Sequence, residues 1–341
     1  MQKKRMKING RLKLSKKGKA MNTKFDVIAL GELLIDFTLS GKSGQGNSLF
    51  EANPGGAPCN VLAMLQKAGH KTAFIGKVGA DQFGYELKSK ITSLGIDSTQ
   101  LKMDPVVHTT LAFVHTLENG DRDFSFYRNP GADVCLSEEE VDEEFLKQGK
   151  IFHFGTLSMT HEGVKKATEK AIAIAEKYHM IRSFDPNLRE PLWDDLEQAK
   201  KQIRYGFEHC DILKISDNEV QFITGKEDLD EGIQEIIDQY QIPLVCLTMG
   251  KDGSKVFYDG KRVSKKGFKC NSIETTGAGD TFCGSVLHYV VEHGMEHLTE
   301  EVLGDMLQFA NAAAALVTTK KGALCSMPEL SEVDQFIKEY I

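Results

Sequence analysis

The sequence lacks the segments that would direct a chain into a membrane or an export pathway, and it lacks a disulfide pattern. No apolar run is long enough to span a bilayer, and the basic N-terminus is not followed by the apolar core of a signal peptide. The seven cysteines are odd in number, scattered, and never form a Cys-x-x-Cys pair, which favours reduced and mostly buried thiols. These absences predict a cytoplasmic protein with no membrane partner.

Acidic residues are absent from the first 24 positions. Ten of the 42 Lys and Arg residues lie there, whereas the whole chain has 49 Asp and Glu residues, so the remainder is strongly acidic. An acidic body argues against a nucleic-acid partner. We expect residues 1–24 to be a disordered basic leader. Residues 16–19 resemble a translated ribosome-binding stretch, so we expect native translation to start at Met21. Residues 25–341 are then one large domain.

Two familiar phosphate-binding motifs are also missing. Gly41-Lys42-Ser43 resembles the end of a P-loop, but the glycine required five residues earlier is Asp36. A dinucleotide-binding fingerprint starting at Gly277 and Gly279 fails because its third glycine is Phe282. Any nucleotide site must therefore use another motif.

A run of small residues at positions 275–284 contains a single carboxylate, Asp280. Apolar residues recur at helical spacing from Val286 to Val291, so the glycines are predicted to lie in a turn and Asp280 in the first turn of a helix. The unpaired amides of such a turn can hold an anion. Asp280 is then placed to accept a proton from an attacking hydroxyl, as phosphoryl transfer to an alcohol requires. A plain glycine turn with Asp280 as a helix-start residue explains the same segment.

A second carboxylate, Asp36, lies inside an apolar segment, where burial is costly unless hydrogen-bond donors surround it. Sugar hydroxyls are suitable donors, and a structural Asp bonded to the backbone is the alternative. Gly55 and Gly56 open a helix that carries Asn60, and glycines there permit close approach of a ligand. Residues 40–53 are rich in glycine and polar residues and are predicted to form a loop.

Apolar runs and helical patterns alternate through the second half of the chain, which predicts a parallel sheet with helices on both faces. The runs cover 151–155, 180–184, 211–215 and 243–249, and the helical patterns cover about 162–178, 194–207, 217–224 and 228–240. Ligands bind such a sheet at the carboxyl ends of its strands. Residues 109–127 alternate around a hairpin turn at 118–121, and with residues 36–50 they predict a small projecting sheet that acts as a lid.

His288, His293 and His297 suggest a metal site, but Gly294 interrupts their spacing and no carboxylate is aligned with them. Solvated histidines at a helix end are the favoured interpretation.

With these residues in place, the chain resembles the ribokinase-like carbohydrate kinases, the PfkB group, over nearly all of residues 25–341. The segment 277–284 matches the C-terminal signature of that family, and 55–60 matches the N-terminal one. The stretches 185–193 and 214–217 are similar to fructokinases. The resemblance implies a three-layer α/β/α fold with a mostly parallel sheet and a lid formed by about 36–50 and 107–130. It also implies transfer of the γ-phosphoryl group of ATP, with Mg²⁺, to the 6-hydroxyl of D-fructose.

The resemblance further implies roles for single residues. Asp280 would be the catalytic base, and Gly277, Ala278 and Gly279 would form the anion hole. The residues facing the sugar would be Asp36, Gly55, Gly56, Asn60, Arg128 and Arg189. Those near ATP would be Asn187, Lys214, Ser216, Glu219, Thr248, Gly250, Gly253 and Asn311, with Glu219 also organising Mg²⁺. A potassium ion would lie near Glu274, Thr276, Val317, Lys320 and Gly322.

Three departures from the family pattern concern Leu62, Ser216 and Glu274. They replace a small residue, the Asn of an Asn-x-x-Glu element, and an aspartate near the monovalent cation. The last change leaves potassium activation open. Two other functions fit the same residues, a 2-keto-3-deoxygluconate kinase and a sugar-sensing regulator that has lost catalysis. The exposed edges of a small sheet also favour a homodimer formed through the lid.

Overall fold

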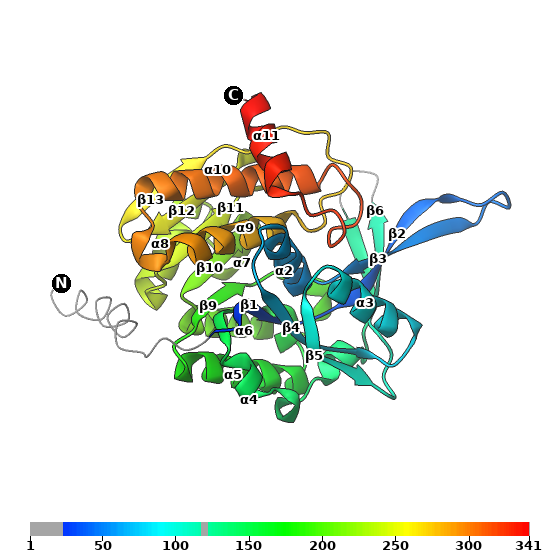
Figure 1. Cartoon of the computed structure of the whole chain (residues 1–341). Helices are drawn as coiled ribbons and strands as arrows, with labels where there is room; N and C mark the ends of the chain where they lie inside the picture. The colour runs from blue at the N-terminus through cyan, green and yellow to red at the C-terminus, as the bar shows by residue number, and fades with distance from the viewer. Residues whose placement is uncertain (1–22, 117–121, 341) are drawn as a thin grey trace.

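A nine-stranded sheet forms the centre of the protein, for which a computed structural model describes residues 23–116 and 122–340 (Figure 1). The predicted leader up to residue 22 and the predicted turn at 118–121 lie outside the described residues. In spatial order the strands are β13 (Lys261–Lys265), β12 (Ser254–Tyr258), β11 (Leu244–Thr248), β10 (Ile212–Ser216), β9 (Ile181–Asp185), β8 (Gly149–Gly155), β1 (Phe25–Leu30), β4 (Thr72–Gly79) and β5 (Asp97–Asp104).

The strands from β5 to β11 run parallel, and β12 and β13 form an antiparallel hairpin at one edge. The prediction of a mostly parallel sheet is therefore confirmed. Strand β5 was missed because it is largely polar at the exposed edge and lacks an apolar run.

Helices cover both faces, giving three layers. On one face lie α2 (Ala57–Lys67), α3 (Gln82–Ser93), α9 (Ala278–His293), α10 (Glu300–Val317) and α11 (Leu330–Tyr340); on the other lie α4 (Glu143–Leu146), α5 (Glu162–Lys177), α6 (Leu196–His209), α7 (Asp217–Thr224) and α8 (Leu229–Tyr240). The period of two in β1 divides the core, because Val27 and Ala29 join one apolar cluster while Ile28 and Leu30 join the other. Short 3-10 helices cover Ala132–Cys135, Glu138–Glu140, Thr156–Met159, Glu190–Leu192, Gly250–Asp252 and Met295–His297.

A second, four-stranded sheet projects from the body, and its strands β2 and β3 form the long blue hairpin of Figure 1. Its order is β3 (Ser48–Gly55), β2 (Leu34–Lys42), β6 (Leu111–Thr116) and β7 (Arg122–Tyr127). The predicted loop at 40–53 is wrong, because most of this segment pairs in the β2–β3 hairpin. Its glycine- and polar-rich composition reflects the exposure of the hairpin and not a lack of backbone partners.

The two faces of this small sheet differ in chemistry. Strand alternation places Asp36 and Thr38 on one face and Phe37 and Leu39 on the other. On the apolar face, the ring of Phe37 stacks on Phe113 at a centroid distance of 4.9 Å, and Phe83 of α3 covers it edge-on. The sheet is therefore anchored to the body through its apolar face.

In the described part of the chain, no helix combines the length and apolar character needed to cross a membrane. All seven cysteines lie in this part, and none of them forms a disulfide.

Candidate active site

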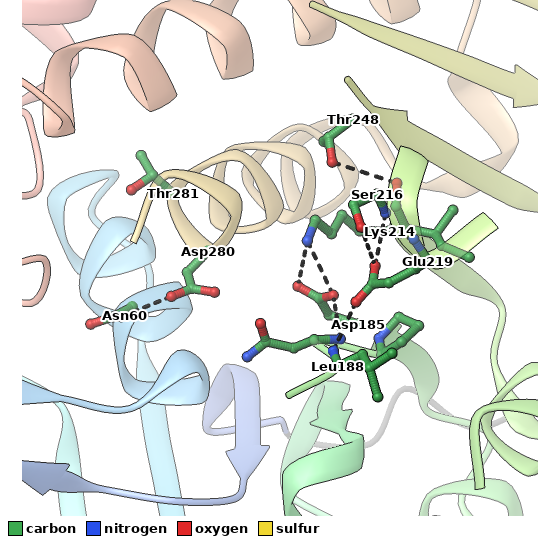
Figure 2. A network of polar contacts seen from close by, with 12 residues as sticks. Asn60, Asp185, Leu188, Lys214, Ser216, Glu219, Thr248, Asp280 and Thr281 are labelled. Atoms are coloured by element: carbon green, nitrogen blue, oxygen red, sulfur yellow. Dashed lines mark hydrogen bonds and ion pairs between the residues drawn. The ribbon is translucent and has the colours of Figure 1, made fainter. Parts of the chain in front are cut away.

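Three parallel strands end in polar residues at one edge of the large sheet. Strand β9 ends at Asp185, β10 at Ser216 and β11 at Thr248, and the last two are paired in register. Helices α2 and α9 begin at the same place, since Asn60 near the start of α2 contacts Asp280 in the first turn of α9. Figure 2 shows Asp280 between Asn60 on one side and the ion pair of Lys214 and Asp185 on the other.

Asp280 is buried and held by a single strong hydrogen bond. Asn60 donates from Nδ2 to Oδ2 of Asp280 at 2.8 Å. Burial raises the pKa of Asp280 above its ordinary value, while the bond from Asn60 and the charges of Lys214 and Arg189 oppose that rise. Asp280 is therefore more basic than an exposed aspartate. Such a group is suited to accept a proton from a hydroxyl.

The first turn of α9 offers unpaired amides beside this carboxylate. Gly277 is the N-cap with φ of 82°, and a Cβ there would lie 2.4 Å from Cβ of Ala323, so only glycine fits. Ala278 donates its amide to the carbonyl of Thr275, whereas no backbone acceptor in the described residues pairs with the amides of Gly279 and Asp280. With no side chain capping this end, the turn keeps its capacity for an anion.

Lys214 brings a positive charge to the same turn. A Cβ placed on Gly279 would lie 3.1 Å from Nζ of Lys214, so the ammonium group borders the helix start. Nζ also lies 3.0 Å from Oδ2 of Asp185. Burial alone would lower the pKa of Lys214, but the carboxylates of Asp185, Glu219 and Asp280 outweigh it and hold that pKa above its ordinary value. Lys214 therefore stays protonated and reinforces the anion site.

Glu219 is fully engaged by the protein. Its Oε1 accepts the amide of Leu188 and its Oε2 accepts both the amide and the hydroxyl of Ser216, each at 2.8 Å. Ser216 and Glu219 form the capping box of α7. Glu219 thus fixes the loop that carries Asn187. The backbone amide of Asn187 donates to Oδ1 of Asp185.

Asp36 reaches the site through a series of contacts. A Cβ on Gly55 would lie 2.2 Å from its Oδ2, so the carboxylate rests directly on the Gly55 backbone. The carbonyl of the next residue, Gly56, accepts the amide of Asn60, which in turn binds Asp280. Gly56 has φ of 130° and packs against the carbonyl of Glu32, so no side chain is tolerated there. Asp36, Gly55, Gly56 and Asn60 therefore form a series of contacts that leads to the predicted base, Asp280.

Arg128 lies in a buried ion pair, and its charge acts on the carboxyl group of Glu32. Its Nε donates to Asp133 at 2.8 Å, Nη2 donates to the carbonyl of Leu157 at 2.8 Å, and Nη1 donates to Thr160 at 3.1 Å. Nη2 also lies 2.6 Å from Asp133. All three nitrogens already have protein partners, which favours a structural role over the expected contact with a sugar.

The residues predicted to line the nucleotide cleft, namely Thr248, Gly250, Gly253 and Asn311, lie close to the carboxyl end of β11 or to the end of β13. Gly253, with φ of 101°, approaches β13 so closely that a Cβ would lie 2.1 Å from the Lys265 carbonyl. Asn311 of α10 donates to the carbonyls of Lys265 and Lys266 at 3.2 Å. Thr248 ends β11 and Gly250 follows it, while the side chain of Asn311 holds the segment at Lys265 and Lys266 against which Gly253 packs.

The residues predicted to lie near a potassium ion are also adjacent. Oε2 of Glu274 accepts the amide of Gly322 at 3.1 Å, and the carbonyl of Val317 accepts the amide of Lys320 at 3.3 Å. Glu274 also donates its own amide to the carbonyl of Thr318. Glu274 thus links the segment before Asp280 to the end of α10 through its backbone amide and to Gly322 through its side chain.

The model of the pfkB family of carbohydrate kinases matches residues 24–330. The chain belongs to this family. A protein named probable fructokinase-2 of Arabidopsis thaliana is 38% identical over 314 residues, which cover 92% of this chain and 95% of that protein. The predicted resemblance to ribokinase-like carbohydrate kinases is confirmed.

Two solved fructokinase structures share the fold of this family member. That of Xylella fastidiosa with bound ATP has a TM-score of 0.84 and 28% identity, covering 92% of this chain and 98% of that one. A double mutant of the Vibrio cholerae O395 enzyme, with fructose, ADP and a potassium ion bound, has a TM-score of 0.83 and 31% identity, covering 93% and 99%. The predicted three-layer α/β/α fold is thereby confirmed.

Two buried carboxylates of this kinase site were not among the predicted site residues. Asp185 ends a buried strand, and that position at the carboxyl end of β9 was the signal that could have identified it. Glu32 follows Gly31 at the end of β1, and it accepts the amide of Ala57 at 2.8 Å beneath the sugar-side loop. The sequence gives no local signal for that contact across 25 positions.

Proposed function

We propose that this kinase transfers the γ-phosphoryl group of ATP to a hydroxyl of D-fructose, at the 6-position. The observation that carries the proposal is the buried Asp280, bonded by Asn60, beside an uncapped helix start bordered by a protonated Lys214. The likeness to fructokinases over 92% of the chain supports fructose as the acceptor. Phosphoryl transfer requires both a proton acceptor at the attacking hydroxyl and fixed positive charge around the moving phosphoryl group.

In this reaction Asp280 accepts the proton of the sugar hydroxyl while the hydroxyl oxygen forms its bond to phosphorus and the bond to the ADP oxygen breaks. Oδ1 of Asn60 is buried and has no hydrogen-bond partner among the described residues, so it is available to orient a sugar hydroxyl. Asp36, on the polar face of the small sheet, accepts hydroxyl hydrogens from the other side of the sugar. Orientation and preorganised donors supply most of the acceleration.

For ATP, the residues present fit a phosphate chain. The amides of Gly279 and Asp280 and the ammonium group of Lys214 provide donors and positive charge where the phosphates would lie. Mg²⁺ would supply charge neutralisation and orientation of the phosphates. Because protein donors occupy both oxygens of Glu219, this residue would hold the ion through bound water. The carbonyls around Val317 and Gly322 are the proposed potassium site.

We also propose that Arg189 faces the substrate, because its charge acts on Asp280 and opposes the rise in the pKa of that carboxyl group. Arg128, whose guanidinium group is bound by Asp133, stabilises the fold instead. A cytoplasmic location agrees with the lack of disulfides among the seven cysteines.

A homodimer formed through the small sheet is supported by its exposed apolar side chains, which are Leu39, Leu49, Phe50 and Tyr127.

The decisive experiment replaces Asp280 by Asn and measures ADP release in a coupled assay. Loss of the general base is expected to lower kcat about 100- to 10,000-fold, while the affinity for ATP is retained. Asp305→Asn, an exposed change on α10, is the matched control and keeps full activity. Near-normal turnover of the Asp280→Asn variant would show that another group takes the proton.

The acceptor is identified with a panel of sugars that includes D-fructose and 2-keto-3-deoxygluconate, run in potassium and in tetramethylammonium buffers. We expect fructose to give the highest kcat/KM and fructose 6-phosphate to be the product. A higher value for the keto acid would reassign the substrate, and no turnover with any sugar would favour a sensing protein. Equal rates in the two buffers would remove the proposed potassium site.

A further inference from the structure

A cluster of metal-binding side chains lies at the ends of α2 and α9 that are distant from Asp280. His70 follows the end of α2, and His288 and Glu292 are four residues apart on one face of α9. The statement from the sequence that no carboxylate is aligned with the histidines is therefore wrong for His288. One nitrogen or oxygen from each of the three lies within 4.8 Å of the others. Nε2 of His70 is 2.8 Å from Nδ1 of His288 and 3.9 Å from Oε1 of Glu292.

We propose that His70, His288 and Glu292 form a binding site for a divalent transition-metal ion, with Zn²⁺ as the fitting ion. Two imidazoles and one carboxylate are a ligand set that Zn²⁺ binds, with water completing a tetrahedral site. Mg²⁺ prefers oxygen ligands only, so this site differs in kind from the one that handles MgATP.

Zn²⁺ binds the neutral form of imidazole. Burial lowers the pKa of both His70 and His288, which favours that form. For His70 the carboxylates of Asp26 and Glu292 oppose this lowering and the charge of Lys150 adds to it.

Ligation exchanges the hydrogen bond between the two rings for two bonds to the ion. The proton shared by Nε2 of His70 and Nδ1 of His288 moves to the other nitrogen of its ring, so both rings stay neutral. Nδ1 of His70 faces Oδ2 of Asp26 at 3.9 Å, and that carboxylate is itself held by the amide of Lys71. A carboxylate behind a ligating histidine fixes its tautomer and raises its basicity. Bond lengths of about 2.0–2.1 Å require the two nitrogens to separate by roughly 0.5 Å.

The ion would join the two helices that form the catalytic centre. Asn60 of α2 and Asp280 of α9 meet at one end of the helix pair, and the proposed site joins the two helices at the other end. Between these points the helices touch at Gly284, where a Cβ would lie 2.8 Å from Cβ of Met64. Metal binding therefore stabilises the helix pair without contacting the substrates.

The test is titration of the full chain with ZnCl₂ by calorimetry, with excess Mg²⁺ present and ATP absent, in a Cys325→Ser background that removes the exposed thiol. We expect one Zn²⁺ per chain and a rise in Tm. Glu292→Gln, at an exposed position, and His288→Gln should each weaken Kd at least about tenfold and reduce the Tm rise. The control is His297→Gln, an exposed histidine outside the cluster, which should bind as the parent does.

Cobalt provides a second measurement, because Co²⁺ in a four-coordinate site absorbs strongly in the visible region. The parent should show this absorption and Glu292→Gln should lose it. If the Glu292→Gln and His288→Gln variants both bound Zn²⁺ as tightly as the parent does, the proposal would be overturned.

Discussion

At the scale of single residues, the carboxyl groups of this kinase differ in what surrounds them. Asp280 receives a hydrogen bond from Asn60 and two nearby positive charges, whereas Glu32 is buried with backbone amides as its donors. Burial raises the pKa of Glu32 to about 7, against the opposing effects of its own amide, the amide of Ala57 and the charge of Arg128. Glu32 therefore keeps its proton in the folded chain at pH values where the unfolded chain has lost it.

This difference makes folding stability depend on pH in a defined direction. Below the unfolded pKa of 4.5 both states hold the proton, and between 4.5 and about 7 only the folded state does, so stability falls as pH rises through that window. Glu32→Gln keeps the acceptor for Ala57 and has no proton to lose. Relative to the parent, it should gain on the order of 3 kcal/mol between pH 5 and pH 8. Urea unfolding of both proteins at the two pH values measures this, and an equal difference at both would contradict it.

Sequence motifs identified Asp280 and Asn60 because each lies in its own glycine-rich segment, although the hydrogen bond of 2.8 Å between them spans 220 positions. The burial of Arg128 depends on carbonyl and hydroxyl acceptors some 30 residues away, at Leu157 and Thr160. No periodic pattern in the sequence predicts such contacts.

At the scale of elements, the packing of α2 on α9 positions the catalytic pair. Gly284 faces α2 so closely that a Cβ would lie 2.8 Å from Cβ of Met64 and 2.9 Å from the carbonyl of Val61. Gly304 on α10 differs, because its nearest neighbour would be Cε of Lys265 at 3.6 Å, an ordinary contact. Two helical glycines thus offer a matched comparison.

Gly284→Ala should force the two helices apart and destabilise the fold by about 1–3 kcal/mol. It should also lower kcat, because the bond between Asn60 and Asp280 spans the same helix pair. Gly304→Ala should be neutral or stabilising by about 0.4–1 kcal/mol through the loss of backbone freedom in the unfolded chain. Urea unfolding and steady-state rates measure both. If Gly284→Ala were as stable and as active as Gly304→Ala, the helix contact would not control the site.

The larger elements were predictable because their apolar periodicity is strong. The predicted helix at 217–224 coincides with α7, whose ends are set by the capping box at Ser216 and by Gly225 in the left-handed conformation. Helices α5 and α8 also lie within two residues of their predicted bounds. The hairpin of β2 and β3 was misjudged because half of its residues are exposed, so burial imposes no alternation on them.

At the scale of the whole molecule, the two faces of the small sheet differ. One face carries Asp36, which is proposed to bind the sugar, and the other face is only partly covered by the rest of the protein. Asp36 and Asn53, paired across β2 and β3, form its polar face. On the opposite face Phe83 covers Phe37, but Leu39 is 55% exposed and Phe50 is 41% exposed. Exposed apolar side chains gathered on one projecting sheet favour a contact with a second copy of the chain.

We expect the protein to be a dimer whose interface includes this apolar face, and a Leu39→Lys, Phe50→Lys variant to be a monomer, because two charges would be buried without partners at the interface. Val106→Lys is the matched control, since Val106 is 80% exposed on the main body and should not affect association. Sedimentation velocity at assay concentrations distinguishes the two states. A monomeric parent, or a dimeric double variant, would show that solvent covers this face. Since Asp36 lies on the same strand as Leu39, dissociation should also raise the KM for the sugar more than that for ATP.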